Sequence, residues 1–166
     1  MYCFSNRYFF NFLKTSRMKL PKEISNGLII FIGIGAYFLL MEVLGLADQI
    51  YLRLFNVLFV FYGTNRTLKT NFTEGKVILV SNAGGALLTA FTGVFLSILG
   101  LIAYSYVKGG DAFVKSLSKT FLFGGNPSVM TYSISLLFEG VVSAVIVTFI
   151  LLLIWETHYA SDKHQI

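Results

Sequence analysis

The feature that most constrains this chain is an uncharged run from Val77 to Val107. As a helix rising 1.5 Å per residue it would be roughly 46 Å long, which exceeds a hydrocarbon core of about 30 Å. Such a helix crosses a membrane with tilt or projects beyond it. The whole chain is 55% hydrophobic and 13% charged, against about 25% charged residues in soluble domains. It therefore lacks the polar surface of a water-soluble domain.

Three further apolar stretches predict additional membrane spans. They cover residues 24–46, 46–63 and 129–155, and each is long enough to be considered as a span by length and hydropathy. The stretch 46–63 is the least regular, because it carries Arg53 and Asn56 and could instead be re-entrant. Together with the span at 77–107, these stretches predict an all-α fold: a polytopic transmembrane bundle of four helices over residues 24–159.

Polar segments connect the predicted spans. Residues 63–76 are rich in Gly, Asn, Thr and charge, which predicts an aqueous loop. The connection 108–127 contains a possible short amphipathic helix at 111–120 before a Gly-Gly-Asn-Pro stop.

The two ends of the chain differ from the spans. Residues 1–23 are aromatic and basic, and charges interrupt the apolar core that a secretory signal needs. Met18 could be the true start; an interfacial helix or an organelle-targeting segment are the alternatives. Residues 160–166 form a polar tail.

The distribution of basic residues predicts the orientation. With four spans, the termini and the 63–76 loop lie on one side and hold most of the Lys and Arg residues. The positive-inside rule places that side in the cytoplasm. We therefore expect a multi-pass protein of the cytoplasmic (inner) membrane with both termini cytoplasmic. The net charge of +5 is explained by these flanking residues, and no basic cluster indicates nucleic-acid binding.

The inventory of reactive side chains is small. The chain has one cysteine and two histidines, and both histidines lie in the C-terminal region, at His158 and His164. An intramolecular disulfide, a CxxC zinc site and an intramembrane Ser-His-Asp triad are therefore excluded. We expect no catalytic residues, metal or cofactor, and hence no enzyme.

Small residues recur at helical spacing in the third and fourth predicted spans. In lipid, helices associate where small side chains let their backbones approach closely. The pattern predicts that these two helices pack tightly together, although the same strip could line a pore. The predicted packing residues are Ala86, Ala90, Gly93, Ser97, Gly100, Gly140 and Ala144.

Glu139 is the most informative residue, because it lies about 15 Å into the last predicted span, near the midplane. A carboxylate there is costly and should face protein, water or a partner charge. Counting from the span ends places it near Arg53 and Asn56. Three interpretations stay open: an ion pair with Arg53 bridged by Asn56, a protonated acid bound to Ser or Thr, and a carboxylate for proton or cation translocation. The predicted polar cluster is Glu139, Arg53, Asn56, Ser135 and Ser143.

Residues 20–160 resemble a family of small four-span membrane proteins of unknown function that is typical of the Bacteroidota phylum. The family shows an aromatic-x-x-Gly entry to the third span and a Glu-Gly-x-x-Ser/Gly element in the last. This chain departs from it at 151–156, where Leu and Trp replace a Met-Gln-Tyr-rich finish. The resemblance implies a four-span fold and brings no activity. The segments that carry it are Phe72–Gly75, Tyr104–Tyr106, Phe123–Pro127 and Phe138–Ser143.

These observations favour a non-enzymatic accessory or assembly component of the membrane. Its predicted soluble parts are short, and its spans carry packing features. The alternative is a small oligomeric transporter or channel that uses the midplane carboxylate; a lipid-modifying enzyme comes third. The expected partners are membrane lipids, and either further copies of the chain or a larger membrane complex.

Overall fold

The computed structural model describes residues 20–76, 78–118 and 126–162. The predicted start at Met18 and the last four residues of the tail lie outside this part. Within it the regular elements are all helices, in agreement with the predicted fold class. They are α2 (Lys22–Val43), α3 (Ile50–Arg53), α4 (Asn56–Thr73), α5 (Leu79–Val107), α6 (Asp111–Leu117) and α7 (Val129–Asp162).

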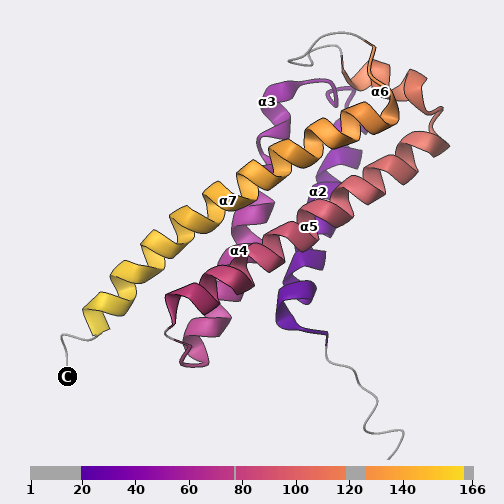
Figure 1. Ribbon diagram of the computed structural model, residues 1–166. Helices are drawn as coiled ribbons and strands as arrows, with labels where there is room; N and C mark the ends of the chain where they lie inside the picture. Colours follow the sequence, from indigo (N-terminus) through magenta and orange to yellow (C-terminus); the bar gives the residue numbers. More distant parts are fainter. Residues whose placement is uncertain (1–19, 77, 119–125, 163–166) are drawn as a thin grey trace, which may run out of the picture.

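The four longest helices run alternately up and down (Figure 1). The start of α2 meets the end of α4, where Lys22 Nζ lies 2.5 Å from Glu74 Oε2. The described ends of the chain therefore lie at the same end of the bundle as the α4–α5 turn. The short helices α3 and α6 lie at the other end, called the α6 end below.

Three helices of the described residues are long and apolar enough to cross a membrane: Lys22–Val43, Leu79–Val107 and Val129–Glu156. They correspond to the predicted spans at 24–46, 77–107 and 129–155. The second predicted span is not confirmed. Residues 46–63 instead contain a turn, the four-residue α3 and the first part of α4. At the far end, α7 continues as a helix to Asp162, into the predicted tail.

The predicted aqueous loop at 63–76 is wrong, because α4 continues as a helix to Thr73. Three of its polar residues, Thr64, Thr67 and Asn71, are buried, whereas Arg66 and Lys69 are exposed. A polar side chain inside a membrane bundle is stable where it bonds across helices. The low hydropathy of this segment predicted that the three buried residues are exposed to water, although they contact other helices.

A chain of hydrogen bonds ties α4 to its neighbours. Thr67 Oγ1 accepts from Asn26 Nδ2 of α2 at 2.9 Å and lies 2.8 Å from Thr89 Oγ1 of α5. On another side, Trp155 Nε1 of α7 donates to Asn65 Oδ1 at 2.9 Å. Helix α4 is therefore bonded to all three candidate spans.

The closest packing surrounds Ile30 of α2, which is fully buried. A Cβ added at Gly63 of α4 would lie 2.4 Å from Ile30 Cγ1, and one added at Gly93 of α5 would lie 2.6 Å from its Cβ. Both distances are far below van der Waals contact. Two glycines thus form a socket for one isoleucine, which brings three helices together.

Candidate functional site

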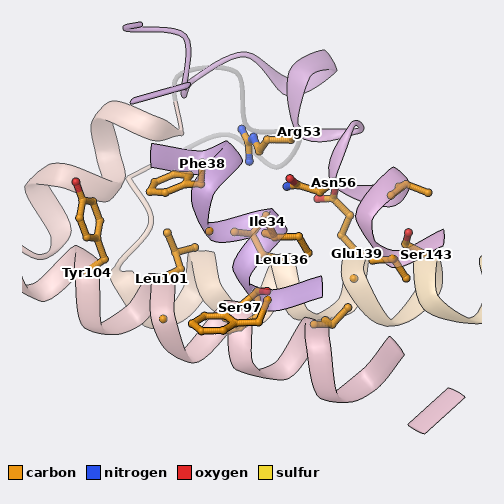
Figure 2. Close-up of a pocket in the computed structure, with 18 of the residues that line it drawn as sticks. Ile34, Phe38, Arg53, Asn56, Ser97, Leu101, Tyr104, Leu136, Glu139 and Ser143 are labelled. Carbon is orange, nitrogen blue, oxygen red and sulfur yellow. The ribbon is translucent and has the colours of Figure 1, made fainter. Parts of the chain in front are cut away.

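A cavity of about 280 Å³ lies among α2, α4, α5 and α7 in the half of the bundle toward the α6 end (Figure 2). It exists because α4 begins only at Asn56, while α2, α5 and α7 continue past that level. Its walls are mostly apolar, and its two charged residues lie on α3 and α7. The apolar lining includes Phe31, Ile34, Phe38, Val57, Val60, Val94, Ile98, Leu101 and Leu136.

Arg53, the last residue of α3, supplies a positive charge to the cavity lining. Its Nη1 donates to the Tyr132 hydroxyl of α7 at 3.0 Å, and its guanidinium carbon lies 5.7 Å from the Tyr132 ring centroid. Its Nε and Nη2 atoms are buried and have no hydrogen-bond partner among the described side chains. These two nitrogens form one edge of the guanidinium, the fork that binds a carboxylate or phosphate with two parallel hydrogen bonds.

Glu139 supplies the negative charge, and its side chain extends from α7 toward Asn56 of α4 (Figure 2). Asn56 Oδ1 and Ser143 Oγ are buried and have no hydrogen-bond partner among the described residues. Glu139 itself is exposed, so the cavity reaches the surface of the bundle. The site therefore combines one charge of each sign with unused polar atoms.

The structure places four of the five predicted cluster residues on this cavity: Arg53, Asn56, Glu139 and Ser143. Ser135 is separate, because its hydroxyl donates to the Thr131 carbonyl of its own helix at 3.1 Å. No ion pair of the described residues joins Arg53 to Glu139; the recorded pairs involve Lys22, Lys76 and Lys108 with other acids. Arg53 instead donates to Tyr132, and the three interpretations of Glu139 stay open.

The predicted packing residues serve two different contacts. Gly140 faces α5, where an added Cβ would lie 2.5 Å from Val94 Cγ1. Gly93 and Gly100 face α2 instead, at Ile30 and Phe31. The strip on α5 thus packs largely against the first span, whereas close approach to the last span occurs at Gly140. The remaining members are Ala86, Ala90 and Ala144, which are fully buried, and Ser97, which lines the cavity.

A second charged group lies at the α6 end. The carboxylate of Glu42 on α2 accepts from the Tyr104 hydroxyl and lies 3.2 Å from Lys108 Nζ, just beyond α5. The hydrogen bond with Glu42 raises the pKa of Lys108 above its ordinary value of 10.5, which further favours the charged ammonium. Tyr104 also lines the cavity, so this group stands at the cavity wall.

Sequence reasoning missed Tyr104 as a cavity residue and did not place Tyr132 in the polar cluster. For Tyr132 a signal exists, because it precedes Glu139 by seven residues, two helical turns, on the same face. Tyr104 carries no such signal, since its partner Glu42 lies on another helix.

Comparison with known proteins gives no relative: no family model, curated protein or solved structure matches this chain. The resemblance to the four-span Bacteroidota family therefore stays a prediction.

Proposed function

We propose that this protein is a non-enzymatic accessory or assembly component of the cytoplasmic membrane, with both termini in the cytoplasm. The observation that carries the proposal is how little of each span is covered by the chain itself. Of the most apolar windows of α2, α5 and α7, 17%, 28% and 22% are buried within the bundle. The outward faces are continuous apolar surfaces on which lipid or partner helices can pack.

The polar side chains inside the bundle support this proposal. The bonds from Asn26 to Thr67 and from Trp155 to Asn65 hold helices together. The described segments between helices are short, so any partner would contact mainly the membrane-embedded faces. A subunit that packs against a partner protein or against further copies of itself needs a stable bundle whose outward apolar faces are uncovered.

Photocrosslinking in native membranes tests the proposal. A photoreactive amino acid would replace Ile32 on α2, Phe95 on α5 or Val142 on α7, which are 65%, 54% and 57% exposed. An accessory subunit should give a discrete protein adduct from one helix face and lipid adducts from the others. Lipid adducts alone from all three positions would contradict the proposal.

The second candidate is a small oligomeric transporter or channel, and one observation favours it. Glu139 lies about 15 Å from the start of α7, on a cavity that reaches the bundle surface, where a second copy could complete a path. If this is correct, Glu139→Gln should abolish an ion-driven flux in proteoliposomes while the protein stays folded. Unchanged flux in that variant would exclude a role for the carboxylate.

A further inference from the structure

We propose that the cavity binds a small zwitterion with an apolar body, of the α-amino-acid class. In this complex the ligand carboxylate binds the Nε–Nη2 edge of Arg53, and the ligand ammonium binds Glu139. The apolar body of the ligand then lies against the walls of α2 and α5.

The two charged residues of the cavity lining indicate a ligand with one charge of each sign. Arg53 and Glu139 both line one cavity, yet no ion pair joins them. A charge in surroundings of low polarity is costly unless it has a partner, and neither residue has a charged one in this cavity. A molecule with its own negative and positive groups satisfies both residues at once, which a simple anion or a simple cation cannot do.

The hydrogen-bonding atoms without a partner indicate which groups of the ligand bind where. Arg53 keeps two donors on one edge, while Asn56 Oδ1 is an unused acceptor near Glu139. A carboxylate takes the paired donors, and an ammonium donates to the acceptors. Because the two nitrogens of Arg53 are buried, the guanidinium must turn about its last torsion angles to present this edge to the ligand.

Size and wall chemistry select the class of zwitterion. At about 280 Å³, the cavity lies just below the range of roughly 300–1,000 Å³ for small-molecule pockets. A phospholipid is too large for it, whereas an amino acid with a large aliphatic or aromatic side chain is of suitable size. The apolar walls, among them Phe31, Ile34 and Leu101, fit such a side chain. This inference does not depend on the accessory role proposed above.

Binding of radiolabelled leucine and phenylalanine to the purified full chain in mild detergent tests the inference. Two analogues of leucine each lack one charged group: 4-methylpentanoate has no ammonium, and isopentylamine has no carboxylate. Saturable binding of an amino acid at or below about 10 mM, with both analogues at least about tenfold weaker, is the expected result. Absence of saturable binding by the folded protein, or equal binding of an analogue, would overturn the inference.

Three variants locate the binding. Arg53→Lys keeps the charge and loses the fork, so it should weaken the amino acid and 4-methylpentanoate by about tenfold or more and leave isopentylamine unchanged. Glu139→Gln should weaken the amino acid and isopentylamine and leave 4-methylpentanoate unchanged. Ser135→Ala, on the same helix but off the cavity, should change none of them. Unchanged binding of all three ligands to both charge variants would place the binding elsewhere, and equal losses for all three would contradict the assigned contacts. The analogue series on the unaltered chain decides if a variant fails to fold.

Discussion

At the scale of single residues, the effect of replacing a glycine depends on the space around it. Gly140 and Gly84 are both helical glycines, yet their surroundings differ: an added Cβ meets Val94 at 2.5 Å at the first, and nothing within 4 Å at the second. We expect Gly140→Ala to lower the free energy of unfolding by about 1–3 kcal/mol, through overpacking.

Gly84→Ala is the matched control for that substitution. It should be neutral or stabilise by up to about 1 kcal/mol, because alanine favours the helix. Reversible unfolding in mixed detergent micelles measures both variants. Equal effects at the two positions would show that the α5–α7 contact at Gly140 is looser than described.

Glu74 gives a pH-dependent prediction at the same scale. Its hydrogen bond with Lys22, and then that with Lys76, hold the pKa of Glu74 below its ordinary value of 4.5. A depressed folded-state pKa stabilises the protein at pH values above the unfolded one. That contribution is lost as the pH falls through the lower, folded value.

Glu74→Gln should therefore lower the melting temperature slightly at pH 7. The difference from the unaltered protein should shrink as the pH falls below 4.5 and vanish below the lowered pKa of Glu74. The effect is small because the pair is exposed to solvent. Thermal melts of both proteins from pH 3 to about pH 7 measure it. A difference that stays constant with pH would show that the ion pair does not cause it.

At the scale of elements, α4 is stabilised by hydrogen bonds between helices as well as by the burial of Val60 and Leu68. Thr67→Val would leave Asn26 Nδ2 and Thr89 Oγ1 without their shared partner. Interhelical hydrogen bonds in membrane proteins contribute about 0.6 kcal/mol on average and up to about 1.7. With two such contacts removed, we expect a loss of about 1–2 kcal/mol in unfolding free energy.

Thr70→Val is the control on the same helix. The Thr70 hydroxyl donates to the Arg66 carbonyl of α4 itself, 2.9 Å away, and not to another helix. This substitution should change stability by less than about 0.5 kcal/mol. Unfolding free energies of the two variants, measured side by side, decide the question. A harmless Thr67→Val would mean that α4 is stabilised by other contacts.

The same element shows what the sequence could and could not predict. The helices α2, α5 and α7 follow from long apolar runs, because lipid-facing residues dominate their composition. The extension of α4 over Thr64, Thr67 and Asn71 could not be predicted, since buried and solvated polar residues look alike in a hydropathy profile. Counting residues along the helices predicted that Arg53 and Asn56 lie near Glu139, and all three line one cavity. Counting did not predict the bond from Arg53 to Tyr132, because it depends on side-chain rotamers.

At the scale of the whole molecule, the alternating helix directions place the α4–α5 turn and the described chain ends at one end of the bundle. The predicted orientation assigns this end to the cytoplasm. In a chain with Cys3 replaced by alanine, a cysteine at Lys69 should react with an impermeant maleimide only after the membrane is opened. A cysteine at Ala112 of α6 should react in intact cells.

Both positions are exposed, so accessibility within the protein does not limit the reaction. Labelling of both cysteines from the same side would contradict the up-and-down arrangement. Labelling with the two sides exchanged would keep the fold and reverse the orientation.

The socket formed by Gly63 and Gly93 around Ile30 also limits how this sequence can evolve. The three positions share one fixed volume, although each lies on a different helix. A methyl group gained at Gly63 would meet Ile30 Cγ1 and Cδ1, which alanine at position 30 lacks, whereas one gained at Gly93 would meet Ile30 Cβ, which every residue except glycine has. In a lineage of related chains we therefore expect Ala at 63 to be accompanied by Ala at 30, and position 93 to stay glycine.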